Sequence, residues 1–232
     1  MSNKRSRRDN RKPQGQTNNE TKRIDSIKPL TEGQQDYIDC ILSNDITFGI
    51  GPAGTGKTFL ATIMAVQALL DGEVEKIILV RPIVESGEKL GFLPGTFQDK
   101  VDPYMRPIYD AMGEVLSPSQ IKQYMESGII EIAPLAFMRG RSLNKCFIIL
   151  DEAQNTTKTQ MLMLLTRIGR RSKAVITGDF TQIDLVRPQD SGLEDAINKL
   201  EGIDGIGICE LESTDIVRHR LVQDIIAAYN KS

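Results

Sequence analysis

The sequence predicts a single α/β domain, with a parallel central sheet flanked by helices, behind a short tail. Strand-like apolar runs recur along the chain, at residues 45–50, 76–80, 129–133, 146–150 and 174–177. Segments with helical periodicity separate several of these runs, and this order implies parallel strands joined by right-handed crossovers. The length of 232 residues suits one such domain plus a tail better than two domains.

The helices are placed by their caps and their apolar spacing. Thr31 is a suitable N-cap for a first helix. A buried helix at 59–70 ends at Asp71-Gly72, before the next strand. Helices at 157–168, near 191–200 and from about 214 to 229, with a strand near 206–211, complete the predicted domain.

The connection from Arg81 to about Pro118 is rich in glycine and proline, and its aromatic residues are interleaved with lysine and arginine. It follows the C-terminal end of a strand, where ligands bind in open α/β sheets. Because long irregular connections are often functional, it is a candidate surface for single-stranded nucleic acid. The alternative is a helical insertion whose aromatics pack a small core of their own. Arg139 and Arg141, on a later connection, are candidates for the same surface.

Residues 1–27 are expected to form a disordered basic tail, and 28–232 the folded domain. Eight Lys and Arg against two acidic residues give residues 1–23 a charge of +6, so with a whole-chain charge of −2 the other 209 residues carry −8. Between Ser2 and Arg23 no side chain is available to build a core. The tail is either an arm that contacts nucleic acid or a solubilising segment.

Composition excludes several classes of protein. Three cysteines without a C-x-x-C pair argue against a disulfide framework or a cysteine zinc site, and His219 is the only histidine. The longest apolar stretch has about 12 residues, which is short of the ~18 that a membrane span requires. We therefore expect a cytoplasmic protein with no membrane partner.

Eight residues after the first predicted strand fit the phosphate-binding pattern G-x-x-x-x-G-K-[ST], called Walker A: Gly51-Pro52-Ala53-Gly54-Thr55-Gly56-Lys57-Thr58. Glycines let the backbone turn tightly and point its N–H groups at a polyphosphate. Lys57 supplies a cation for the terminal phosphates, and the Thr58 hydroxyl is a ligand for Mg²⁺. Because a strand precedes the loop and a helix follows it, as the motif requires, we expect ATP and Mg²⁺ to bind here.

Asp151 follows the apolar run Cys146-Phe147-Ile148-Ile149-Leu150 and matches Walker B. A buried strand in this position brings a carboxylate to the Mg²⁺ that bridges the β- and γ-phosphates. The neighbouring carboxylate of Glu152 is suited to accept a proton from the water that attacks the γ-phosphate. A kinase must exclude that water, so this pair favours ATP hydrolysis, and a P-loop kinase is the weaker alternative.

Several of these segments resemble motifs I, II and III of superfamily 1 helicases, namely Gly51 to Thr58, Asp151-Glu152-Ala153-Gln154 and Gly178-Asp179-x-x-Gln182. Leu30-Thr31-Glu32-Gly33-Gln34 is similar to the preceding Q-motif. Three more segments are similar to the PhoH family of ATPases, and the resemblance runs from about residue 28 to 229. They are Arg81-Pro82-Ile83-Val84-Glu85-Ser86-Gly87-Glu88-Lys89-Leu90-Gly91-Phe92-Leu93-Pro94-Gly95, Phe137-Met138-Arg139-Gly140-Arg141 and Asp215-Ile216-Val217-Arg218-His219.

The resemblance implies a single RecA-like P-loop domain that hydrolyses ATP, assembles into a ring, expected to be a hexamer, and acts on RNA. By their places in the motifs, Gln34 would read the adenine edge, and Asp179 and Gln182 would sense the γ-phosphate. The strand that ends at Gly178 would lie between the P-loop strand and the Walker B strand, which brings Gln182 near the phosphate. Unlike superfamily 1 helicases, the chain is expected to have no second RecA-like domain, and it is expected to have no PIN nuclease domain either.

A ring also predicts that an arginine enters each site from the neighbouring subunit, because an arginine supplied in trans accelerates phosphoryl transfer. Without a second RecA-like domain, the donor must be another copy of the chain in a closed head-to-tail arrangement. Arg218 and Arg220, on the predicted last helix, are the candidates. They point about 200° apart, so only one can face a given phosphate, and Arg218 is preferred.

Two classes of function remain open. One is an ATPase that binds or remodels RNA or single-stranded DNA, and the other is an NTP-switched assembly protein that acts on a protein partner. Gln34, Gln182, the basic tail and the two arginines near 140 favour nucleic acid. The charge of −8 on the rest of the chain disfavours it, since phosphate contacts dominate nucleic-acid affinity.

Overall fold

The computed structural model describes residues 28–82, 105–106, 108–217, 221–222 and 225. The predicted tail at 1–27, most of the connection at 83–104, and both candidate trans arginines, Arg218 and Arg220, lie outside the described residues.

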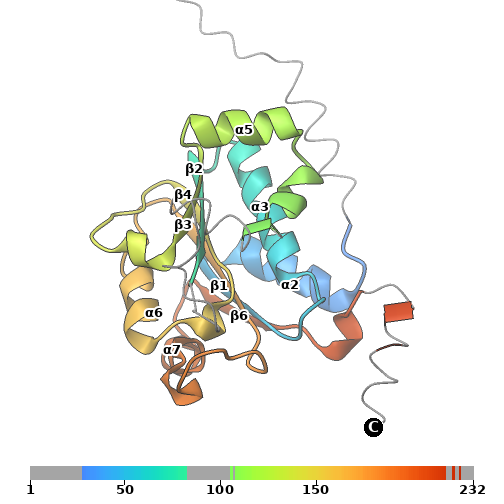
Figure 1. Ribbon diagram of the computed structural model, residues 1–232, viewed down its shortest axis with the longest axis vertical. Helices are drawn as coiled ribbons and strands as arrows, with labels where there is room; N and C mark the ends of the chain where they lie inside the picture. Colours follow the sequence, from blue (N-terminus) through green and yellow to red (C-terminus); the bar gives the residue numbers. More distant parts are fainter. Residues whose placement is uncertain (1–27, 83–104, 107, 218–220, 223–224, 226–232) are drawn as a thin grey trace, which may run out of the picture.

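The described residues contain one sheet of six strands: β1 (Ile46–Ile50), β2 (Lys76–Arg81), β3 (Ile130–Pro134), β4 (Cys146–Leu150), β5 (Lys173–Gly178) and β6 (Ile206–Glu210). All neighbouring strands pair in parallel, in the order β3-β2-β4-β5-β1-β6 (Figure 1). The predicted parallel α/β fold is confirmed. The predicted position of β5 between β1 and β4 is confirmed too, so the carboxyl ends of these three strands meet at one edge of the sheet.

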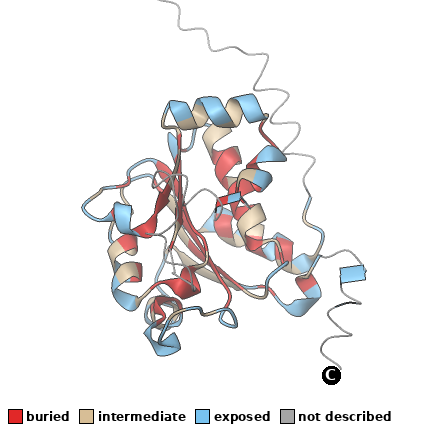
Figure 2. Ribbon diagram, in the orientation of Figure 1, coloured by how far each residue is buried: buried red, intermediate tan, exposed pale blue. Residues whose placement is uncertain are grey.

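Helices cover both faces of the sheet (Figure 1). On one face pack α2 (Glu32–Ser43), α3 (Lys57–Leu70) and α5 (Pro118–Glu126); on the other pack α6 (Lys158–Leu165) and α7 (Gly192–Leu200). Successive strand residues enter opposite cores, as in β2, where Leu79 belongs to the first cluster and Val80 to the second. Because both faces are covered, the central strands are buried along almost their whole length (Figure 2). No described helix is long and apolar enough to cross a lipid bilayer.

The described end of the 81–118 connection is helical. Residues 105–106 and 108–113 are in helical conformation. Met105, Ile108 and Met112 are buried in the same core cluster as α3, and Tyr109 packs against it. The alternative of a helical insertion therefore agrees with the conformation of these residues, but they extend the main core instead of packing a small core of their own.

Two predicted helix boundaries are also wrong. α6 ends at Leu165 rather than 168, so Arg167 and Arg170 follow the helix. The last helix does not begin near Thr214, because Ser213–Asp215 form a 3-10 turn (η5) and the next residue is extended. The Asp215 carboxylate closes this turn by accepting the backbone N–H of Glu212 at 2.8 Å.

Candidate functional site

The candidate site lies where the carboxyl ends of β1, β4 and β5 meet. A cavity of about 470 Å³ opens there, and its wall includes most of the predicted site residues. Those on the wall are Ala53, Gly54, Gly56, Lys57, Thr58, Asp151, Glu152, Asp179 and Gln182. Gly51, Pro52 and Thr55 belong to the same loop behind this wall, and Gln34 contacts the loop from outside. Arg218 lies outside the described residues.

The loop between β1 and α3 has the backbone that its glycines predict. Gly51, Gly54 and Gly56 have φ angles of +146°, +90° and +87°, a region that other residues rarely adopt. A Cβ on Gly51 would also lie only 2.2 Å from the backbone oxygen of Leu211. Gly56 is the N-cap of α3 and has no side chain to occupy the first N–H groups of the helix. The positive end of the α3 dipole therefore faces the cavity, as in sites that bind anions.

Lys57 is folded back onto the loop. Its Nζ donates to the backbone oxygens of Gly51 at 2.6 Å and Pro52 at 2.8 Å. Burial lowers the pKa of Lys57, and the negative charges of Asp179, Glu152 and Asp151 oppose that shift. Neutral carbonyl groups of the loop thus hold the ammonium group. A negatively charged phosphate can attract it away from them.

Asp151 connects the predicted Walker B motif to the predicted Walker A motif. Its Oδ1 accepts hydrogen bonds from the hydroxyl of Thr58 at 2.6 Å and of Thr177 at 2.8 Å. Mg²⁺ prefers such oxygen ligands, and in nucleotide sites it needs only one or two from the protein because water and phosphate supply the others. Thr58 and Asp151 therefore fit a Mg²⁺ site, although the described residues contain no cluster of three or more metal-binding side chains.

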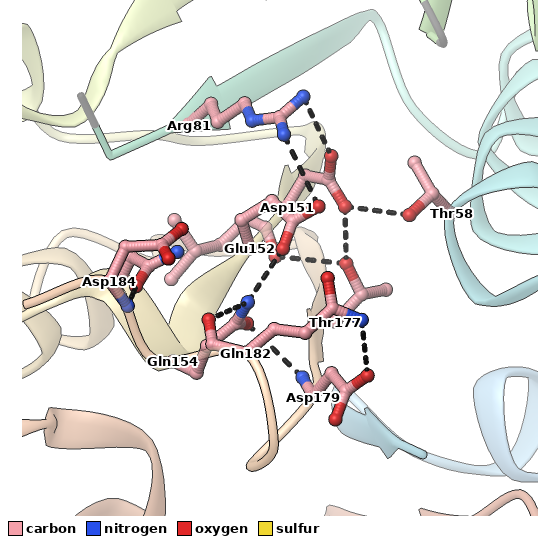
Figure 3. A network of polar contacts seen from close by, with 11 residues as sticks. Thr58, Arg81, Asp151, Glu152, Gln154, Thr177, Asp179, Gln182 and Asp184 are labelled. Atoms are coloured by element: carbon pink, nitrogen blue, oxygen red, sulfur yellow. Dashed lines mark hydrogen bonds and ion pairs between the residues drawn. The ribbon is translucent and has the colours of Figure 1, made fainter. Parts of the chain in front are cut away.

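Glu152 has protein donors on both carboxylate oxygens (Figure 3). Arg81 Nη2 donates to its Oε1 at 3.2 Å, and Gln154 Nε2 donates to its Oε2 at 2.6 Å. The other terminal nitrogen of Arg81 lies 3.7 Å from Asp151 Oδ2. Sequence reasoning assigned Glu152 to the site but missed Arg81 and Gln154. The available signal was that Arg81 directly follows a predicted strand, while Gln154 is the fourth residue of the segment similar to motif II.

Asp179 and Gln182 connect β5 to the phosphate-binding loop. Asp179 Oδ2 accepts the backbone N–H of Ala53 at 3.1 Å and the amide of Gln182 at 2.7 Å. Burial alone would raise the pKa of Asp179, but hydrogen bonds from Thr181 and Gln182, together with the charge of Lys57, hold it below its ordinary value. The loop and the segment similar to motif III are therefore mechanically linked.

Gln34 is buried against the outer side of the loop. Its Nε2 donates to the backbone oxygen of Thr55 at 3.0 Å, and its Oε1 accepts the N–H of Leu30 at 2.8 Å. Both ends of the amide are thus engaged with the protein, and the side chain is not on the cavity wall. Gln34 therefore supports the loop through these contacts, and its reading of an adenine edge stays a prediction.

The two arginines predicted to bind nucleic acid differ in their surroundings. Arg141 forms a two-pronged ion pair with Glu131, at 2.5 and 2.7 Å. Arg139 is exposed and follows the 3-10 turn η2 (Leu135–Met138), in which Phe137 is also exposed. Neither arginine lines the cavity, so the structure does not bring them together with the loop.

The site as a whole combines a backbone cradle for a polyanion, a hydroxyl and a carboxylate suited to Mg²⁺, and a second carboxylate beside them. Such a set is suited to bind a nucleoside triphosphate and to activate a water against its terminal phosphate.

Comparison with known proteins gives close relatives over most of the chain. The family model for PhoH-like proteins matches residues 26–230. The chain is 58% identical over 206 residues to a PhoH-like protein of Bacillus subtilis (strain 168), covering 89% of the chain and 65% of that relative. It is 42% identical over 206 residues to Protein PhoH of Escherichia coli (strain K12), covering 88% of the chain and 58% of that relative. The chain therefore spans less than two thirds of the length of these relatives.

Among solved structures, the large terminase from a thermophilic bacteriophage is similar in fold. The TM-score is 0.52 at 10% sequence identity, and the match covers 86% of this chain and 50% of the terminase chain. At this identity the likeness concerns the fold alone.

Proposed function

The chain belongs to the family of PhoH-like proteins, and on this premise we propose that it is a Mg²⁺-dependent ATPase whose turnover takes place in the cavity beside α3. The proposal rests above all on the 2.6 Å hydrogen bond between Thr58 and Asp151. These two side chains are 93 residues apart in sequence, and their contact joins the loop suited to phosphate to the carboxylate suited to Mg²⁺.

In the proposed reaction the loop N–H groups and the N-terminus of α3 hold the β- and γ-phosphates. Lys57 leaves the loop carbonyls and contacts the γ-phosphate, where charge accumulates in the transition state. Thr58 and Asp151 would hold Mg²⁺, which would neutralise charge on the phosphate oxygens. Glu152 accepts a proton from the attacking water, and the new P–O bond forms as the bond to ADP breaks.

Two variants test this assignment. Lys57→Ala should weaken ATP binding by about 30-fold, because it removes one charge-assisted contact worth ~2 kcal/mol. Glu152→Gln should leave ATP affinity within about threefold of wild type and lower turnover by about 100-fold, because shape is kept and the base is lost. Lys76→Ala, an exposed lysine at the far end of β2, is the matched control. Normal ATP binding and turnover by Lys57→Ala would remove the assignment.

A finer proposal is that turnover is coupled to RNA or single-stranded DNA. Its support is the exposed pair Phe137 and Arg139, since aromatic stacking and cationic contacts to phosphate together bind single strands. Arg141 is set aside from this surface because its guanidinium is paired with Glu131. Phe137→Ala should reduce stimulation of turnover by single-stranded RNA without changing basal turnover. Absence of any stimulation in wild type would favour the alternative, an ATPase that acts on a protein partner.

The assembly is proposed to be a cytoplasmic ring of six identical chains, with Arg218 entering the neighbouring site. The size of the particle in solution, measured by light scattering with and without ATP, tests the ring. A particle that stays monomeric at all concentrations would contradict it.

A further inference from the structure

Glu152, the proposed base, is held by its neighbours rather than presented to the cavity as a free carboxylate. One oxygen has the guanidinium of Arg81 as donor at 3.2 Å, and the other has the amide of Gln154 at 2.6 Å. Figure 3 shows the carboxylate between these two donors. Each carboxylate oxygen can accept a second hydrogen bond, but a protein donor already bound to it competes with a water, so exchange of one donor for the water makes that oxygen fully available.

Of the two donors, Gln154 is the more firmly fixed. It is completely buried, its Nε2 also donates to the backbone oxygen of Gln182, and its Oε1 accepts the N–H of Asp179. Moving it would disturb the segment similar to motif III. Arg81 has a partly exposed side chain and reaches Glu152 through a long flexible stem. The exchange is therefore expected at the oxygen that Arg81 holds.

The position of Arg81 follows from the register of the sheet. β2 and β4 are adjacent, Val80 pairs with Leu150, and the N–H of Asp151 donates to the oxygen of Val80 at 2.9 Å. The last residue of β2 is thus next to the two carboxylates that follow β4. From there the guanidinium of Arg81 faces both carboxylates, at 3.7 Å from Asp151 Oδ2 and 3.2 Å from Glu152 Oε1.

The backbone of Glu152 adds a second constraint. Its φ angle is +55°, which is a left-handed backbone conformation. Residues other than glycine rarely adopt it, and it persists only where surrounding contacts hold it. The contacts with Arg81 and Gln154 are of this kind. Weakening one of them would free a carboxylate oxygen of Glu152, which already lines the cavity, to accept a water.

We propose that Arg81 is a positioning residue that holds Glu152 in a resting arrangement, so that release of the Arg81–Glu152 contact limits basal ATP turnover. This inference rests on the proposed ATPase function. It differs from a purely structural role, in which Arg81 would only neutralise the two carboxylates, because a structural role predicts that removing Arg81 lowers turnover or stability and never raises turnover.

The test uses the full chain and measures kcat and KM for ATP without nucleic acid. Arg81→Gln should raise kcat between about threefold and tenfold, tenfold being ~1.4 kcal/mol, with KM unchanged within about twofold. Arg81→Lys should fall between wild type and Arg81→Gln, because lysine keeps the charge but lacks the fork that reaches both carboxylates. Lys76→Gln makes the same change of charge at the other end of β2 and should leave kcat unchanged.

A double variant tests whether Arg81 acts through Glu152. In a Glu152→Gln background, Arg81→Gln should give no increase, since the residue through which Arg81 acts is gone. An increase there would overturn the inference, and so would Arg81→Gln turnover at or below wild type while ATP still binds. If Arg81→Gln does not fold, as judged by thermal melting, Arg81→Lys decides, and turnover at or below wild type again overturns the inference. ATP binding in the same samples distinguishes failure of this inference from failure of the proposed function. Binding that is absent, or unaffected by Lys57→Ala, refutes the proposed function as well.

Discussion

Replacing Gln34 by alanine is expected to weaken the binding of any triphosphate, whether or not it has an adenine. Gln34 is 5% exposed, and its side-chain amide bridges the backbone oxygen of Thr55 in the phosphate-binding loop and the N–H of Leu30. The resemblance to the Q-motif predicts instead that Gln34 reads the adenine edge. Support of the loop predicts weaker binding of every triphosphate, whereas reading of adenine predicts weaker binding of ATP only, so the variant can distinguish the two roles.

The size of the effect follows from the two bonds. Each neutral hydrogen bond contributes about 0.5–1.5 kcal/mol net, and a buried group left without a partner costs about 1–3 kcal/mol. Gln34→Ala should therefore lower the free energy of unfolding by about 2–4 kcal/mol. Part of this loss comes from reduced order of the phosphate-binding loop. We expect that part to weaken triphosphate binding by about 1–2 kcal/mol, which raises Kd roughly five- to thirtyfold.

The assay compares ATP with inorganic tripolyphosphate by calorimetry, because tripolyphosphate has no base. If Gln34 supports the loop, the two affinities fall by the same factor. Gln35→Ala is the matched control, since Gln35 is on the same helix but contacts Asp39 on the surface. A loss confined to ATP, with tripolyphosphate bound as in wild type, would refute the supporting role and favour recognition of adenine.

Two further predictions concern stability. Asp179 has a lowered pKa in the folded protein, burial being outweighed by hydrogen bonds such as those from Thr181, so its ionised form stabilises the fold above the unfolded pKa. The excess stability of wild type over Asp179→Asn should be constant above about pH 5 and shrink as the pH falls below about 4; a gap that widens on acidification would contradict this. Tyr37 is fully buried, and its hydroxyl has no hydrogen-bond partner among the described residues. Tyr37→Phe should raise the free energy of unfolding by about 1 kcal/mol in urea titrations, whereas a decrease would show that the hydroxyl has a partner.

The sequence was sufficient where a motif and its context are local. The glycines of the phosphate-binding loop, the helix after it and the carboxylate after β4 all follow from short segments whose apolar pattern predicts their neighbours. The placement of β5 between β1 and β4 came from resemblance rather than from pattern, because the order of parallel strands is not written in any one strand.

What the sequence did not predict depends on contacts between distant segments. The pairing of Arg81 with Glu152 requires the register of β2 against β4, which apolar runs do not specify. Arg141 looked like a free cation until the structure placed it beside Glu131. α5 was missed although Ser117 and Gln120 form a capping box with a proline at the helix start, a local signal hidden by the surrounding glycines and prolines.

The charges around the cavity leave an excess of negative charge that further cations would be needed to balance. Lys57 is the only basic residue on the described part of its wall, whereas the acidic residues there are Asp110, Glu114, Asp151, Glu152 and Asp179. Arg81, which is not on this wall, is directed at two of these carboxylates. A triphosphate entering such a site adds negative charge that one lysine and one helix dipole do not balance. Mg²⁺ held by Thr58 and Asp151, as proposed, would supply part of the difference, and the proposed arginine from a neighbouring copy would supply the rest at the step where charge on the γ-phosphate is greatest. On this argument we expect the acidic wall to keep turnover low in an isolated subunit, and we expect turnover to rise when the proposed ring assembles.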